Sequence, residues 1–112
     1  MIEIILKKFL ETQFDLPIKL ENTEKIDSDY IVLDKTGSNY ESTLYSSTVA
    51  IQSYSSTLYK AAELNEKVKK VMLNELIKLD EINSVELNSD YNYTDTSMKQ
   101  YRYQAVFDIF YY

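Results

Sequence analysis

A switch in the spacing of apolar residues between positions 46 and 79 is the feature that most limits the fold. In the first part, SSTVAIQSYSS, Val49 and Ile51 alternate with small or polar residues, which is the period of two of a half-buried strand. From Leu58 onward the apolar residues recur every three or four positions, as on one face of a helix. The sequence therefore predicts a strand that leads directly into a long amphipathic helix ending near residue 79.

The two faces of this predicted helix differ in composition. The apolar stripe contains Leu58, Ala61, Ala62, Val68, Met72, Leu76 and Leu79, widened by Leu64 and Val71. The opposite stripe contains Lys60, Glu63, Lys67, Lys70, Asn74 and Lys78. A helix patterned in this way packs one face on a core and exposes the other to water.

The residues before position 46 predict a second helix and two further strands. Helical spacing joins Ile2, Ile5, Leu6, Phe9, Leu10 and Phe14, and Pro17 cannot continue the helix. A short strand is expected around Ile18 and Leu20, and a polar connection over residues 21–29. The apolar run YIVLD at 30–34 predicts a buried strand, and residues 35–41, with the only glycine, predict a turn or an extended hairpin tip.

Two strands are expected after the long helix. In VELNSDYNYTD, alternation places Val85, Leu87, Tyr91 and Tyr93 on one side and Glu86, Asn88, Asp90 and Asn92 on the other. In QYRYQAVFDIFYY, one face carries Tyr101, Tyr103, Ala105, Phe107, Ile109 and Tyr111. Residues 94–99 form the expected turn between these strands.

These elements predict one domain, residues 1–112, of the α+β class. Two helices are expected to pack on one face of a largely antiparallel sheet of four to five strands, in the order α-β-β-β-α-β-β. Apolar residues also fall on the second sheet face, within YIVLD and at Val106, Phe110 and Tyr112. Because one chain offers no further layer to cover them, we expect copies of the chain or other proteins to do so.

Composition removes many kinds of chemistry. Cysteine and histidine are both absent, so disulfides, Cys–zinc sites, thiol catalysis and the commonest general base are excluded. The net charge of −6 and the single arginine, Arg102, argue against a surface that binds nucleic acid tightly. The N-terminus lacks the order of regions of a signal peptide, and no window has the length of a membrane span. We therefore expect a cytosolic product with no membrane partner.

Each candidate for a catalytic, cofactor or metal site is better explained as an ordinary structural feature. The series Asp90, Asn92, Thr94 and Asp95 suggests a calcium loop, but glycine and glutamate are missing where such a loop needs them. Asp80 and Glu81 are adjacent on a helix and cannot face each other. One glycine cannot build a phosphate loop, and a Ser–Lys pair stays an open but weak alternative. The expectation is a protein that is not an enzyme and holds no cofactor or metal.

Tyrosine and serine are concentrated between residues 39 and 59, and aromatic residues close the chain. Such a stretch fits either ordinary strand packing or a protein-contact surface, because tyrosine offers a large contact area at low entropic cost. We predict a subunit interface that contains Tyr40, Tyr45, Tyr54, Phe110 and Tyr112.

The chain resembles the small tail-completion or tail-terminator (head–tail joining) proteins of long-tailed phages and prophages of low-GC Gram-positive bacteria. The resemblance lies in YIVLDKTG, STVAIQSYSSTLYKAAELNEKVKKVM, LNSDYNYTD and KQYRYQAVFDIFYY. These motifs cover nearly the whole chain and are structural rather than chemical, so no specific contact residue is transferred from the family.

The resemblance implies a structural virion protein with an α+β fold that works at the head–tail junction after a stage in the host cytoplasm. Such proteins cap the tail tube, stop its polymerisation and form the surface that joins the head, as a hexameric ring that in some members closes only on the tail. The implied partners are copies of itself, the major tail tube protein and a head-completion or connector protein. DNA would pass through the lumen without specific binding. Two alternatives stay open, namely another neck or head-closure component and a small adaptor that binds a host protein.

Overall fold

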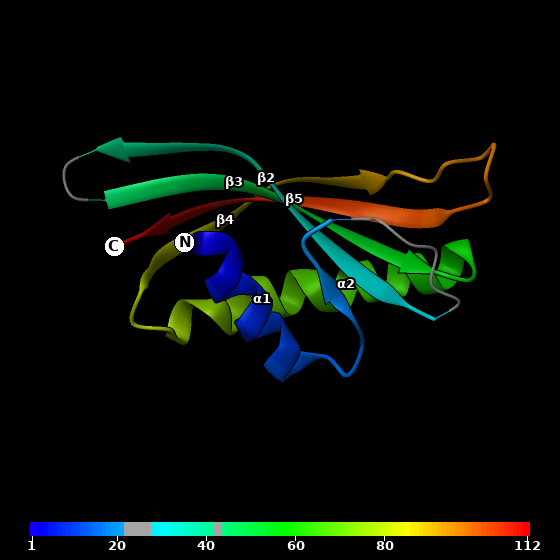
Figure 1. Cartoon of the computed structure of the whole chain (residues 1–112), viewed down its shortest axis with the longest axis horizontal. Coiled ribbons are helices and arrows are strands. Elements are labelled where there is room, and N and C mark those ends of the chain that lie inside the picture. Colours follow the sequence, from blue (N-terminus) through cyan, green and yellow to red (C-terminus); the bar gives the residue numbers. More distant parts are fainter. Residues whose placement is uncertain (22–27, 42–43) are drawn as a thin grey trace.

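The computed structural model describes residues 1–21, 28–41 and 44–112, which form an α+β fold with the predicted order of elements (Figure 1). The polar connection expected over residues 21–29 therefore lies mostly outside the described residues. In chain order the elements are α1 (Ile2–Gln13), β1 (Ile18–Lys19), β2 (Tyr30–Glu41), β3 (Leu44–Ser55), α2 (Leu58–Asn74), the 3-10 helix η1 (Leu76–Lys78), β4 (Ile82–Asn92) and β5 (Tyr101–Tyr111).

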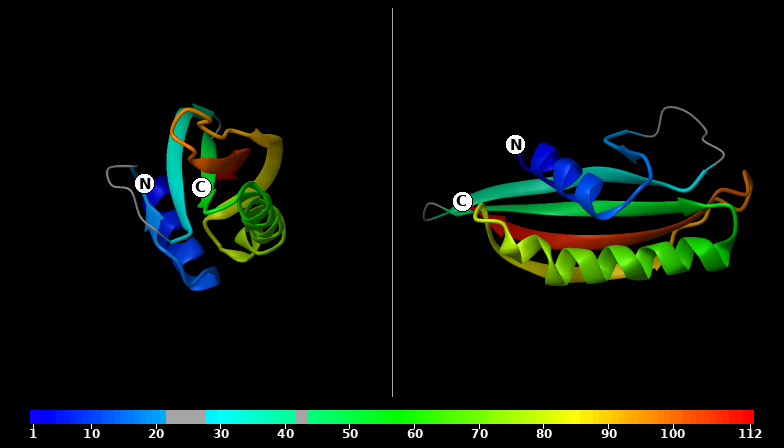
Figure 2. Two further views of the ribbon diagram at one scale, coloured as in Figure 1. Left: turned by 90° about the vertical axis from the view of Figure 1, so that its right-hand side faces the viewer. Right: turned by 90° about the horizontal axis from the view of Figure 1, so that it is seen from below.

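The described strands form one sheet of five, in the spatial order β1-β2-β3-β5-β4. The short β1 is parallel to β2, and every other neighbouring pair is antiparallel. Helix α1 lies against β1 and β2, and α2 lies against β3, β5 and β4, so both helices occupy one face, the helix face (Figure 2). The other side of the sheet is called the open face below. The predicted architecture is confirmed.

The core lies between the helices and the helix face of the sheet. Because side chains alternate along a strand, every second residue of β3 and β5 points into it. The most deeply buried strand residues are Ile31, Leu33, Val49, Ile51, Ala105, Phe107 and Ile109. They pack against Ile2, Leu6, Phe9 and Leu10 of α1 and Leu64, Val68 and Met72 of α2. The apolar faces predicted for β5 and for both helices supply this core.

Helix α2 begins at a hydroxyl cap and ends earlier than predicted. The Thr57 side chain accepts a hydrogen bond from the backbone N–H of Lys60, at 3.1 Å, which satisfies one of the first amides of the helix. The regular helix stops at Asn74, and η1 then carries Leu76 into the core. The predicted helix to residue 79 is therefore wrong at its end, because a tighter 3-10 turn can place the same apolar residue against the sheet.

Residues 35–41 continue strand β2, so of the two forms predicted there, a turn or an extended hairpin tip, the extended hairpin is observed. They pair with β3 as far as Glu41 opposite Leu44, which makes a long hairpin. Gly37 sits inside the strand next to a register shift between Lys35 and Gly37. A glycine inside a strand often marks such a bulge, and here it does not mark a chain reversal.

Strand β4 has two register shifts, between Ile82 and Ser84 and between Leu87 and Ser89, and the latter overturns the side-chain alternation predicted there. Leu87 pairs with Phe107, but Ser89 pairs with Val106, so Asn88 is an extra residue in the ladder. Beyond this bulge the strand changes faces. Val85 and Leu87 lie on the helix face, whereas Tyr91 and Tyr93 lie on the open face. Asp90 turns toward α2 as a result.

Candidate functional site

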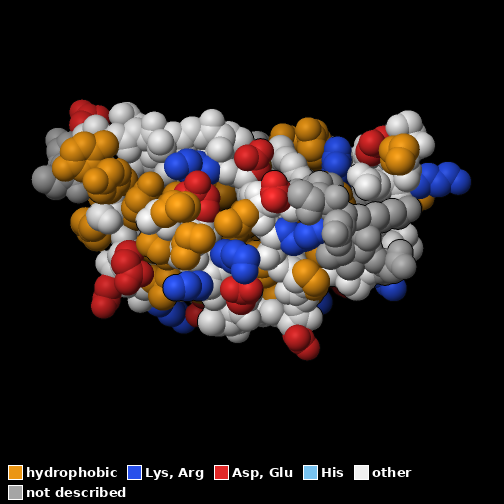
Figure 3. Space-filling model, viewed as in Figure 1, with side chains coloured by type: hydrophobic (Ala, Val, Ile, Leu, Met, Phe, Trp, Pro, Cys, Tyr) orange, Lys and Arg blue, Asp and Glu red, His pale blue; other side chains and the backbone are white. Residues whose placement is uncertain are grey.

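Hydrophobic side chains gather on the surface at the end of the sheet that contains the β2–β3 hairpin (Figure 3). This end is called the aromatic end because Tyr40, Tyr45 and Tyr112 are exposed there. The register places Tyr40 opposite Tyr45, and Tyr45 opposite Tyr111. Their ring centroids are 4.5 Å and 5.5 Å apart along this row. Tyr40 is 56% exposed and Tyr45 45% exposed. The row thus offers a broad aromatic surface that the chain itself leaves open.

Hydrogen bonds fix the C-terminal part of the aromatic end. The hydroxyl groups of Ser47 and Tyr111 lie 2.8 Å apart within hydrogen-bonding distance. The Asn83 side-chain amide donates to the Tyr112 hydroxyl at 2.7 Å, and the Tyr112 backbone N–H donates to the carbonyl of Glu81 at 3.0 Å. Tyr112 is nevertheless 65% exposed, so its ring is held in place while most of its surface faces solvent.

A cavity of about 350 Å³ adjoins this row on the helix side of the sheet. Its walls come from the first residues of the chain and from three strands, namely Met1, Ile2, Glu3, Ile5, Lys35, Tyr45, Tyr111 and Tyr112. The Lys35 ammonium lies 3.5 Å from a Glu3 carboxylate oxygen, which ties β2 to α1. The cavity wall therefore combines apolar and aromatic side chains with one ion pair.

Sequence reasoning missed the contribution of the N-terminus to this surface. Met1 had no assigned role and is highly exposed, and Ile5 was assigned to the core stripe but is only partly buried. The sequence places Tyr111 on the core face and also among the terminal aromatic residues that fit a contact surface. The aromatic row itself could have been found, because opposed hairpin positions can be counted outward from a known register.

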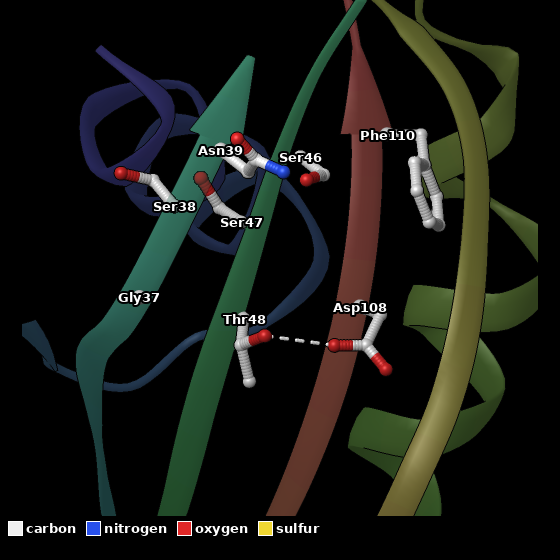
Figure 4. Close-up of a pocket in the computed structure, with 8 residues that line it drawn as sticks. All are labelled: Gly37, Ser38, Asn39, Ser46, Ser47, Thr48, Asp108 and Phe110. Carbon is white, nitrogen blue, oxygen red and sulfur yellow. Dashed lines mark hydrogen bonds between the residues drawn. The ribbon is translucent and has the colours of Figure 1, made fainter. Parts of the chain in front are cut away.

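The open face holds a shallow cavity of about 260 Å³ near the same end (Figure 4). Figure 4 shows Asn39, Ser46 and Phe110 around it, from β2, β3 and β5, with both helices behind the sheet. At its far side the Thr48 hydroxyl donates to Asp108 at 2.8 Å, and the Asn88 amide donates to the second oxygen of Asp108 at 3.1 Å. The cavity thus offers hydroxyl and amide groups beside a single aromatic ring.

Four of the five residues predicted for a subunit interface lie at this end, and the fifth does not. Tyr40, Tyr45 and Tyr112 belong to the aromatic end, and Phe110 lies on the open face close to it. Tyr54 is at the opposite end of β3 and is only 4% exposed. The structure therefore brings together a smaller set than the sequence predicted.

Tyr54 is buried in a stacked cluster on the open face. Its ring lies parallel to that of Tyr30, with centroids 4.4 Å apart. Arg102 donates from Nη1 to the Tyr54 hydroxyl at 3.0 Å and from Nε to the carbonyl of Tyr93 at 2.6 Å. The pKa of Tyr30 is raised above its ordinary value, mainly by burial and further by Tyr54, while Arg102 opposes the shift. The Tyr54 side chain is therefore engaged by contacts within its own chain and is not exposed for a neighbouring subunit.

The expectation that a single chain leaves the second sheet face uncovered is therefore wrong in part. Tyr30, Val32 and Tyr54 form a buried cluster there. Much of the rest of the face is polar and linked by hydrogen bonds, for example from Gln52 to Gln104 at 2.9 Å and from Gln104 to the Tyr91 hydroxyl at 2.6 Å. Val106 and Phe110 are partly buried. Exposed aromatic side chains therefore lie at both ends of the sheet, at the aromatic end and, on the open face of the opposite end, at Tyr91 and Tyr93.

Two of the acidic side chains considered as ligands, Asp90 and Asp95, have structural partners. Asp90 accepts from Asn65 of α2 at 3.1 Å and from Lys69 at 2.8 Å, and this bond to Asp90 is the main reason that the pKa of Lys69 is raised. Asp95 caps the β4–β5 turn by accepting from Ser97, and that bond chiefly lowers the pKa of Asp95. Within residues 1–21, 28–41 and 44–112, no three His, Cys, Asp or Glu side chains come together as a metal site.

Comparison with known proteins adds no family assignment. No family model matches the chain, and no curated protein is significantly similar to it. In the described part of the chain, neither α-helix combines the length and the apolar character needed to cross a bilayer. The aromatic end and the fold that presents it are therefore the features on which a function must be argued.

Proposed function

We propose that this chain is a structural protein of a bacteriophage virion that caps the tail tube, stops its polymerisation and forms the surface that joins the head. In this proposal it acts as a hexameric ring at the head–tail junction. The sequence resemblance suggests this role, and an α+β domain with both helices on one face of an antiparallel sheet is compatible with it.

The aromatic end is the observation that carries the proposal. Tyr40, Tyr45 and Tyr112 expose about half or more of their surface at one end of a molecule that is 44 Å long. Met1 is 78% exposed beside them. Grouped exposed apolar and aromatic residues mark sites of protein association, and tyrosine gives contact area at low entropic cost. A ring subunit needs such a surface for its neighbours or for the tube.

The charge of the chain also fits passage of DNA through a ring. With a net charge of −6, the protein repels a phosphate backbone on average and would not hold it. In the proposed assembly, copies of the chain form the ring, the tail tube protein lies below it, and a head-completion or connector protein lies above it.

Deletion of the gene from the phage or prophage that encodes it tests this function. We expect tails of uncontrolled length that carry no head, and normal virions again when the wild-type gene is supplied. A Tyr40→Lys variant produced at the same level is expected to fail in this rescue, because it places charge in the aromatic end. A Lys70→Glu variant, changed on the exposed side of α2, serves as the control and should restore virions.

Normal tails and joined heads in the deletion strain would overturn the proposal. If the purified chain then captured a host protein through the same tyrosines, the adaptor alternative would replace it.

A further inference from the structure

Both long edges of the sheet are unpaired along much of their length. β1 pairs with β2 only at Ile31 and Val32, so the outer edge of residues 34–41 has no strand beside it among the described residues. At the other side of the sheet, β4 has β5 as its one strand neighbour in the described part of the chain. Such edges present free backbone N–H and C=O groups that can pair with another strand.

The two free edges lie at the same height along the strands, and their strands run in opposite directions. Asn39 of β2 lies opposite Ser46, which lies opposite Phe110, which lies opposite Ser84 of β4. These four residues form one row across the sheet on the open face. Three successive antiparallel pairings make β4 antiparallel to β2. A second copy displaced sideways would therefore bring its β4 antiparallel to the β2 of the first, at the same level.

The matching stretches are regular, and each contains one charged residue, Glu41 or Glu86. The backbone N–H of Tyr40 already donates to the Asn39 side chain at 2.8 Å. Residues 37–41 of β2 and 84–87 of β4 lie beyond or between the register shifts, so their ladders are uninterrupted. Neither stretch contains lysine or proline, the residues that most often block edge pairing. On the helix face, Tyr40 is exposed beside one edge and Leu87 at the other. Leu73 and Ile77, from the end of α2 and from η1, are exposed as well.

We infer that copies of this chain join edge to edge, with residues 37–39 of one copy paired antiparallel to residues 84–86 of the next, so that Asn39 lies opposite Ser84. In this register Tyr40 lies opposite Asn83 of the neighbour, near the end of β4 that η1 precedes and where Ile77 is exposed. Each copy uses a different edge for each of its two neighbours, so the contact is heterologous and closes into a ring when the rotation between copies permits. The twist of the sheet supplies a rotation at every contact. The inference rests on the proposed ring and states which strands close it.

Engineered cysteine pairs test this contact, because the chain has no cysteine of its own. In the double variant Asn39→Cys/Ser84→Cys, both thiols lie on the open face, and opposed residues of antiparallel strands are close enough for a disulfide. At concentrations where native mass spectrometry finds multimers, oxidation is expected to give a ladder of covalent multimers without reductant. The matched control, Ser38→Cys/Ser84→Cys, uses the same edges but opposite faces and should give no ladder.

A second variant tests the edge without a disulfide. Leu87→Lys introduces an edge-blocking lysine at a position that is already 38% exposed. We expect the multimer fraction to fall about tenfold or more, which corresponds to roughly 1.4 kcal/mol per contact, while the thermal unfolding midpoint changes little. Multimers that persist at wild-type levels in this variant would contradict the inference.

The remaining outcomes separate this inference from the proposed function. Equal ladders from the matched and mismatched cysteine pairs, or a chain that stays monomeric at every concentration, would overturn edge pairing. If the deletion strain nevertheless made aberrant tails, the proposed function would stand with a different ring contact. If the deletion left tails normal but the matched pair alone formed ladders, edge pairing would stand and the tail function would fall.

Discussion

Tyr45 and Tyr111 stack across β3 and β5 with their ring centroids 5.5 Å apart, at the point where the sheet extends past its helices. The Tyr111 hydroxyl is held by Ser47, and the Tyr45 ring contacts Tyr40 on its other side. The strand pairing therefore orders these rings before any partner arrives. An ordered aromatic surface loses little side-chain entropy on binding, which favours association.

Tyr40→Lys is predicted to separate association from folding. Tyr40 is more than half exposed, so its replacement should change the free energy of unfolding by no more than about 1 kcal/mol. The same charge in the aromatic end should abolish multimers in native mass spectrometry. Ile51→Asp is the control, since it buries a carboxylate in the core and should unfold the domain. Loss of the fold in both variants would show that Tyr40 belongs to the core.

Tyr54 is predicted to act through stability and not through assembly. Tyr54→Ala should lower the free energy of unfolding by about 3–5 kcal/mol, because a buried aromatic ring is removed from its stack with Tyr30. Tyr54→Phe keeps the ring but removes the bonds to Arg102 and Gln52, and should lose about 1–3 kcal/mol. Urea titration of both variants measures these differences. Multimer formation unchanged in Tyr54→Phe is part of the expected result.

The link between α2 and β4 is predicted to weaken at alkaline pH. The pKa of Lys69 is raised in the folded chain, chiefly by its hydrogen bond to Asp90 and then by that to Glu66. Stability from this charge is complete below the ordinary lysine pKa and is lost as pH rises through the raised one. Lys69→Met should lose about 0.2–1 kcal/mol at neutral pH, and its difference from wild type should shrink in strongly alkaline solution. Denaturant titrations of both proteins across that range test this.

Gly37→Ala is predicted to be neutral or stabilising. A Cβ built on Gly37 meets nothing within 4 Å, and no glycine in the described residues has a positive φ angle. Alanine should therefore reduce the freedom of the unfolded chain at no steric cost, for a gain of about 0.4–1 kcal/mol. Thermal unfolding of the variant measures the gain. A clear loss of stability would mean that the bulge beside Gly37 tolerates only a residue without a side chain.

Much of the fold follows from the spacing of apolar residues. Alternation in β3 and β5 and helical spacing in α1 and α2 identified the residues that form the core, such as Val49, Phe107 and Val68. These patterns are informative because a residue on the wrong face would lose a large burial energy. The charged and polar residues on the other side of α2 likewise predicted which face of this helix is exposed.

The features that the sequence did not predict depend on how the strands pair, and residue type alone does not reveal this pairing. The extra residue Asn88 moves Tyr91 and Tyr93 to the other face, and no composition signal marks such a bulge in advance. Gly37 resembles a turn residue but lies within a strand. Tyr54 looks like any other tyrosine of its segment until the register brings it to Tyr30 and Arg102. The candidate site was therefore only partly predictable, since exposure depends on these pairings.

The position of Arg102 bears on the proposed passage of DNA through a ring of these chains. It is the one arginine of the chain, and its guanidinium is fixed between the rings of Tyr54 and Tyr93, 5.6 Å and 4.5 Å from their centroids. A planar guanidinium grips phosphate with two parallel bonds, whereas a lysine ammonium acts as a hydrated point charge on a flexible stem. In the proposed ring, a DNA duplex would therefore meet flexible lysine side chains, while the guanidinium of Arg102 is engaged by Tyr54 and Tyr93 of its own chain.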